Sequence, residues 1–170
     1  MEDLNNMWTY VHSRLNIELK QRSLTPVDLE AVFISGGSAG GYITFQAGHL
    51  LTPPAGLIAM YVLKRTFGVK YMQEAASRPD LYYLFPHSVL FPQFSVQDSY
   101  SPIVLAHGTG DTTVPYEQSV FFSEHLTSKG FYNELYLLEG KYNFWDLGEE
   151  DDVLEVKAKI WAFLDKLASH

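Results

Sequence analysis

A chain of 170 residues, of which 46% are hydrophobic and 19% charged, is long enough for one domain with a buried core and too apolar to be disordered. Its formal net charge of -8 argues against nucleic acid and anionic membrane surfaces as partners, because both bind clustered Lys and Arg. No stretch is apolar enough to span a membrane, and the first ten residues lack the basic and apolar regions typical of a signal peptide. The absence of cysteine excludes disulfides and thiolate metal sites, so we expect a cytoplasmic protein.

The first predicted element in chain order is an amphipathic helix. Its apolar residues recur at helical spacing from Leu4 to Leu15, and we expect it to end before the turn-forming sequence SLTPVD. The run AVFIS at 31–35 is apolar on both faces and precedes two glycines, which is typical of a buried strand in a parallel sheet. A helix over 39–51 and a second buried strand over 56–63 follow.

The second half of the chain begins with an irregular excursion over about 64–100. A helix is predicted within 71–85, and the rest is too rich in Pro, Ser and aromatic residues for a regular element. The regular pattern then resumes with a strand at 102–108, a helix at 115–128, a strand at 133–140 and a helix at 151–167. This alternation predicts a single domain, a three-layer α/β sandwich with a mostly parallel sheet and a functional site at the carboxyl ends of its strands.

Ser38 lies in the sequence GGSAGG, between the predicted strand 31–35 and the predicted helix 39–51. A serine in so sharp a turn adopts strained backbone angles, and Gly36, Gly37 and Gly40 supply neighbours without bulk. The N–H of Ala39, at the start of the helix, is placed to donate to an oxyanion. The alternative is a glycine-rich turn that binds a phosphate or nothing, although neither the Walker nor the dinucleotide pattern is present.

This sequence around Ser38 resembles the nucleophile elbow of the α/β-hydrolase superfamily, specifically of its serine esterases and prolyl-oligopeptidase-like members. The block HGTGDTTVP at 107–115 is similar to the part of that family which carries the triad acid, and the acid corresponds to Asp111. The alternative for Asp111 is an ordinary turn aspartate before a helix. The resemblance implies hydrolysis of a small-molecule carboxylic ester through an acyl-enzyme on Ser38, with no metal and no other cofactor.

The general base of the triad is missing from the sequence. In the family a histidine follows the last strand, but this chain reads EGKYNFW, so that Asn143 occupies the histidine's place or the histidine has been lost beside it. An asparagine amide cannot accept a proton near neutral pH. Of the six histidines, His87 in the excursion remains a candidate substitute for the base. The other five are expected to pack, face solvent or lie out of reach: His12, His49, His107, His125 and His170.

The resemblance covers the second half of the hydrolase fold. The strands that precede the nucleophile in the family, with their H-G-G-type oxyanion loop, have no counterpart before Ser38, so the sequence predicts a truncated fold. Strand 31–35 would then lie open at an edge of the sheet, and we expect a homodimer through it. Two functions stay open: a weak or inactive serine hydrolase, and a hydrolase-like pseudoenzyme or fragment that acts as a binding module.

Overall fold

A sheet of four parallel strands, in the order β1-β2-β3-β4, forms the centre of the protein. In the computed structural model, which describes residues 2–48, 50, 52–61 and 100–169, the strands are β1 (Phe33–Gly37), β2 (Gly56–Met60), β3 (Ile103–Gly108) and β4 (Asn133–Leu138). The predicted parallel α/β sheet is confirmed. The predicted helix within 71–85 and all of the predicted excursion except Tyr100 lie outside the described residues.

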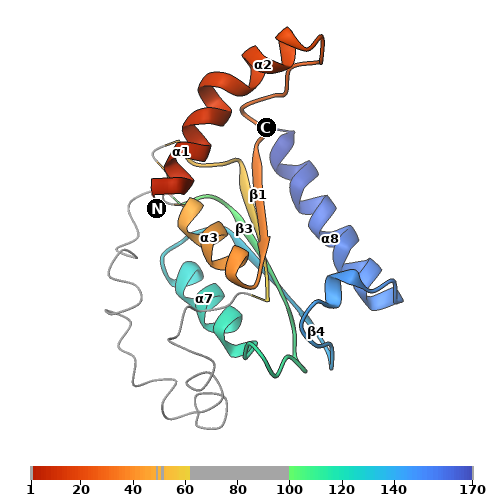
Figure 1. Cartoon of the computed structure of the whole chain (residues 1–170). Helices are drawn as coiled ribbons and strands as arrows, with labels where there is room; N and C mark the ends of the chain where they lie inside the picture. Colours follow the sequence, from red (N-terminus) through yellow and green to blue (C-terminus); the bar gives the residue numbers. More distant parts are fainter. Residues whose placement is uncertain (1, 49, 51, 62–99, 170) are drawn as a thin grey trace.

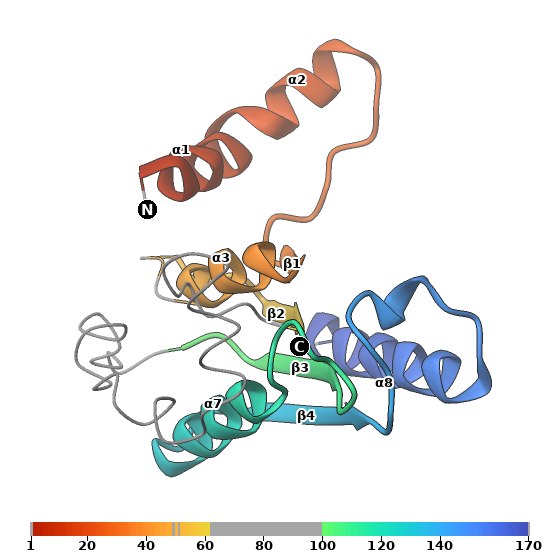
Figure 2. The same cartoon turned by 60° about the horizontal axis from the view of Figure 1, so that its bottom comes forward.

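Helices lie on both faces of this sheet, and a helical segment that precedes β1 extends beyond it (Figure 1, Figure 2). The helical elements of the described residues are α1 (Glu2–Tyr10), the π-helical turn η1 (Val11–Leu15), α2 (Asn16–Gln21), α3 (Ala39–Ala47), α7 (Glu117–Ser128), the 3-10 turn η2 (Trp145–Leu147) and α8 (Asp151–Ala168). Figure 1 shows α8 on one side of the sheet and α3 and α7 on the other. Figure 2 shows α2 and the loop after it projecting away from the sheet. The three layers are as predicted.

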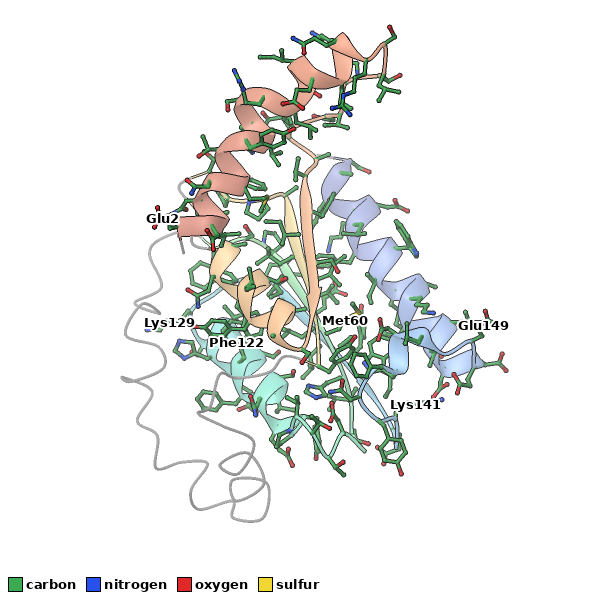
Figure 3. All side chains as sticks on the ribbon, in the orientation of Figure 1. Glu2, Met60, Phe122, Lys129, Lys141 and Glu149 are labelled. Carbon is green, nitrogen blue, oxygen red and sulfur yellow. The ribbon has the colours of Figure 1, made fainter. Side chains whose placement is uncertain are left out.

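The buried strands supply two separate cores, because successive side chains of a strand point to opposite faces. Ile103 of β3 packs in one cluster with Phe45 of α3 and Phe122 of α7, whereas Val104 packs in the other with Phe163 of α8. The rings of Phe45 and Phe122 stack with their centroids 4.1 Å apart, and Figure 3 labels Phe122 on α7. All six residues of β3 are buried, which explains the apolar run at 103–106 in the sequence.

Some predicted boundaries differ from the structure. The strand predicted at 31–35 is shifted, because Gly36 and Gly37 stay extended and pair with β2 as part of β1. The strand predicted at 56–63 ends at Met60, because Tyr61 takes a positive φ of 35° that breaks the strand. The helix predicted at 39–51 ends earlier, since α3 stops at Ala47.

β1 and β4 are the edge strands of the sheet that the described residues form. An edge position for β1 is what the sequence predicted for strand 31–35. Within the described part of the chain, no helix combines the length and the apolar character needed to cross a membrane.

Candidate active site

Ser38 lies in the sharp turn between β1 and α3. Its backbone angles, φ 54° and ψ -120°, fall outside the regions that L-residues favour, and such strain is common at functional sites. The N–H of Ser38 donates to the carbonyl of Met60 at 3.1 Å, which fixes the turn to the end of the neighbouring strand. Ser38 itself is half-buried, and Ala39, the first residue of α3, is exposed.

The glycines before Ser38 are required by close packing. A Cβ at Gly36 would lie 2.4 Å from the carbonyl oxygen of Gly40 and 2.7 Å from Thr44 Oγ1. A Cβ at Gly37 would lie 2.6 Å from the hydroxyl oxygen of Tyr61. Gly40 differs from the expectation, because the described residues leave a Cβ there no contact within 4 Å. Position 36 requires glycine because the backbone of Gly40 lies against it, whereas position 40 itself has room for a Cβ.

Asp111 follows β3 and is 6% exposed. Its Oδ1 accepts hydrogen bonds from the N–H groups of Thr113 at 2.8 Å and Val114 at 2.9 Å. The neighbouring N–H of Gly110 donates to the carbonyl of Lys141 at 2.9 Å, so the loop after β3 is attached to the loop after β4. The second carboxylate oxygen of Asp111 is thereby turned toward the loop after β4.

Asn143, in the loop after β4, makes the contact that would orient a base. Its Nδ2 donates to Asp111 Oδ2 at 2.7 Å. A carboxylate can only accept, so the amide nitrogen must face Asp111. The chain reaches this position through Gly140, which takes a positive φ of 67° after β4. The structure therefore brings Asp111 and Asn143 together.

His107 is buried near Asp111 with both ring nitrogens hydrogen-bonded. Its Nε2 lies 2.9 Å from the carbonyl oxygen of Val114, so Nε2 carries the proton, and Nδ1 accepts from the hydroxyl of Ser119 at 2.8 Å. Burial lowers the pKa of His107, although Asp111, 3.4 Å from Nε2, opposes this shift. His107 is thus a neutral packing residue with no free nitrogen for a substrate.

The remaining histidines of the sequence do not complete the site within the described residues. His12 lies in η1, where its ring contacts Trp8 at a centroid distance of 4.7 Å, and His125 lies in α7. His49, His87 and His170 lie outside the described residues. In that part of the chain, no cluster of three or more His, Asp or Glu side chains is arranged to bind a metal ion.

Two residues of the site were not singled out from the sequence. Tyr61, directly after β2, is 5% exposed, and the carboxylate of Asp146 in η2 lies nearby. Burial raises the pKa of the Tyr61 phenol, and the negative charge of Asp146 raises it further. Tyr61 falls inside an apolar run in the sequence, so only its spatial neighbours reveal its position.

The strand register places Ser38, Asp111 and Asn143 at the carboxyl ends of the parallel strands. Gly37, Met60 and Ala106 lie level across β1, β2 and β3, and Ser38, Asp111 and Asn143 all follow the carboxyl ends of their strands. Figure 3 shows Met60, at the end of β2, and Lys141, beyond β4, toward this same end of the molecule. In open α/β sheets, ligands bind at the carboxyl ends of the strands.

This chain is similar to a known protein family and to several solved structures. Residues 18–170 match the model of the Prolyl oligopeptidase family. No curated protein matches the chain significantly.

Solved structures with the same fold have low sequence identity to the chain. The acylaminoacyl peptidase of Pyrococcus horikoshii is 19% identical with a TM-score of 0.64, and the match covers 88% of this chain and 26% of that protein. MGS-M1, an α/β-hydrolase enzyme from a Medee basin deep-sea metagenome library, is 19% identical with a TM-score of 0.69, covering 98% and 65%. The sugar hydrolase YeeB of Lactococcus lactis is 20% identical with a TM-score of 0.65, covering 99% and 67%.

Each match covers most of this chain but a smaller share of the solved protein. The chain corresponds to about a quarter of the acylaminoacyl peptidase and about two thirds of the other two proteins. All three nevertheless contain its parallel sheet and flanking helices. With its sequence match over residues 18–170, the chain belongs to the prolyl oligopeptidase family and has the α/β-hydrolase fold.

Proposed function

We propose that this chain is a serine hydrolase domain that acts on carboxylic esters through Ser38, with turnover close to background because Asn143 stands in the place of the base. The observation that carries the proposal is the 2.7 Å hydrogen bond from Asn143 Nδ2 to Asp111 Oδ2. It gives position 143 the contact of a triad base, and the amide there cannot take up a proton.

Ser38, Ala39 and Asp111 each have one role in the proposed reaction. The Ser38 hydroxyl attacks the ester carbonyl, and the N–H of Ala39 at the start of α3 donates to the oxygen that becomes negative. Asp111, held by two backbone N–H groups, would orient an imidazole and stabilise its charge. With an amide at position 143 the proton of Ser38 has no acceptor. Loss of a triad base costs up to about 10⁶-fold in kcat.

The same hydrogen bond also favours a second function, in which the chain is a binding module. An Asn143–Asp111 pair is satisfied without a substrate and stays neutral at the amide across the physiological pH range. The strained Ser38 turn would then hold a carbonyl ligand without cleaving it. Reversible binding of an uncleavable ester analogue, unchanged by Ser38→Ala, would favour this function over hydrolysis.

Hydrolysis of p-nitrophenyl acetate separates the two functions. We expect the unmodified chain and Ser38→Ala to give equal rates, and Asn143→His to exceed both by about 100-fold or more, the usual contribution of a general base. Asn143→Gln, which keeps an amide, is the matched control, and Ser38→Ala in the Asn143→His chain should abolish the gain. A folded Asn143→His protein with no gain would contradict the hydrolase proposal.

A further inference from the structure

The loop after β4 packs directly against the loop after β3, just before the chain reaches Asn143. A Cβ at Gly108 would overlap the carbonyl oxygen of Lys141, and a Cβ at Gly110 would lie 2.6 Å from the carbonyl oxygen of Gly140. The N–H of Gly110 also donates to the carbonyl of Lys141 at 2.9 Å. The two loops are therefore in contact through their backbones, and Lys141 lies at that contact.

The side chain of Lys141 joins this contact to the start of α8. Its Nζ lies 3.0 Å from Oδ1 of Asp152, in the first turn of α8, and 3.6 Å from Oε1 of Glu150, the residue that precedes the helix. Contact with the Asp152 carboxylate raises the pKa of Lys141 and lowers the pKa of Asp152, so both groups stay charged near neutral pH. One lysine thus connects the loops after β3 and β4 with α8.

Asn143 lies between two anchored residues of its loop. Lys141 is two residues before it, and Trp145, two residues after it, is 5% exposed in the core cluster that includes the buried face of α8. Between them Phe144 takes a positive φ of 61°, and such an angle in a bulky residue persists only where the surrounding contacts fix it. The 2.7 Å contact of Asn143 with Asp111 therefore depends on where these anchors place the loop.

We propose that Lys141 is a positioning residue, whose ion pairs with Asp152 and Glu150 hold the loop after β4 so that the side chain at position 143 meets Asp111. The ammonium of Lys141 is engaged by the two carboxylates and acts on position 143 only through the loop. This inference rests on the proposed function, since the alignment of position 143 matters for turnover only where that residue serves Ser38 as a base.

The test of turnover uses the Asn143→His protein, in which a base is present. Lys141→Met keeps an apolar stem and removes the charge, and it should lower kcat for p-nitrophenyl acetate by about 10-fold, the effect of a small misplacement, with KM unchanged. Lys141→Arg keeps the charge and should keep kcat within about 3-fold. Lys141→Glu, which repels Glu150 and Asp152, should lower kcat further than Lys141→Met does.

Salt should act through the same ion pairs. At about 1 M NaCl, where the Debye length is about 3 Å, kcat of the Asn143→His protein should fall toward that of its Lys141→Met variant. The Lys141→Met variant itself should show no such dependence on salt. A side chain that only filled space would give the same salt dependence in both proteins, and that result would overturn the proposal.

Lys159 offers a matched control, because its Nζ lies 2.6 Å from Oε1 of Glu155 in an exposed ion pair within α8. Lys159→Met should leave kcat unchanged. A second measurement does not need activity: in the chain that keeps Asn143, hydrogen exchange of the Gly110 amide and of the Asn143 side-chain amide should speed up in Lys141→Met but not in Lys159→Met.

These measurements tell the failures apart. An inactive Asn143→His protein, together with faster exchange of both amides in Lys141→Met, contradicts the proposed function and supports the positioning role. Unchanged kcat together with unchanged exchange in Lys141→Met overturns the positioning role. An equal fall of kcat in Lys159→Met overturns it as well, because the effect would then follow from the loss of any lysine.

Discussion

The amide of Asn143 satisfies the carboxylate oxygen of Asp111 that would orient a base, at 2.7 Å. Removing that amide deprives the oxygen of this donor and opens the space beside it. Free imidazole fits this space chemically, since it can donate to Asp111 with one nitrogen and accept the proton of Ser38 with the other. The chemistry that the residue at position 143 lacks can thus be supplied from solution.

At the residue scale we therefore predict chemical rescue of Asn143→Gly. Its hydrolysis of p-nitrophenyl acetate should rise and saturate with imidazole concentration, and the same imidazole should do nothing for the unmodified chain, in which Asp111 is already paired. Imidazole itself cleaves the ester, so Asn143→Gly combined with Ser38→Ala supplies the blank. A rise that is equal in this blank would contradict the prediction.

Sequence motifs identified Ser38, Asp111 and Asn143 because each lies in a short run of chain with recognisable chemistry. Tyr61 and Asp146 could not be found in this way. The two residues lie far apart in the chain, and Tyr61 stands in an apolar run that reads as strand. The packing role expected for His107 agrees with its two hydrogen bonds, to Ser119 and Val114.

At the element scale, β1 and α3 approach so closely that Gly36 has no room for a side chain. We predict that Gly36→Ala lowers the free energy of unfolding by about 1–3 kcal/mol, the cost of overpacking. Gly40→Ala is the matched control: a Cβ there meets nothing within 4 Å, and alanine favours the helix by about 0.5–1 kcal/mol. Urea unfolding measures both, and equal losses in the two variants would contradict the packing argument.

His107 joins β3 to α7 and makes the stability of the fold depend on pH. Because burial lowers the pKa of His107 below its ordinary value of 6.5, the unfolded chain binds its proton first as the pH falls. The free energy of unfolding should therefore decrease as the pH falls below 6.5, by at most about 1.4 kcal/mol per pH unit from this residue. Unfolding curves of His107→Gln should show a smaller slope between about pH 6.5 and pH 5; an unchanged slope would assign the effect to other groups.

Periodicity placed most helices and strands correctly, because the buried strands are apolar on both faces and α8 has a single apolar stripe. The errors fall where tertiary contacts override local preference. Gly36 and Gly37 read as a turn but extend β1, since the backbone of α3 and the ring of Tyr61 lie against them. Tyr61 reads as strand but takes a positive φ, and its ring packs against Gly37 and Phe144.

At the scale of the whole molecule, the two edges of the sheet differ in charge. At β4, the carboxylate of Glu134 accepts from Tyr132 and Tyr136, and Lys166 Nζ donates to the Tyr132 hydroxyl at 2.7 Å. Charged side chains protect an edge from pairing with another chain. At the other edge β1, with the sequence FISGG, has no charge, and Ser35 in its middle is exposed.

We therefore predict that two copies of the chain pair through β1. Light scattering coupled to size-exclusion chromatography should give the mass of a dimer. Ser35→Lys, which places a charge on this edge strand, should shift the protein to monomer, and Leu137→Lys, on the exposed part of β4, should not. A monomer at all concentrations, or equal effects of the two lysines, would contradict pairing through β1.

Labelling of Ser38 by a fluorophosphonate, followed by intact mass, tests the central claim most directly, because it asks only whether the serine is activated and not which ester is bound. The account predicts that the unmodified chain is labelled no faster than Ser38→Ala, while Asn143→His is labelled at Ser38 about 100-fold faster or more. Rapid labelling of the unmodified chain at Ser38, matching that of Asn143→His, would contradict it.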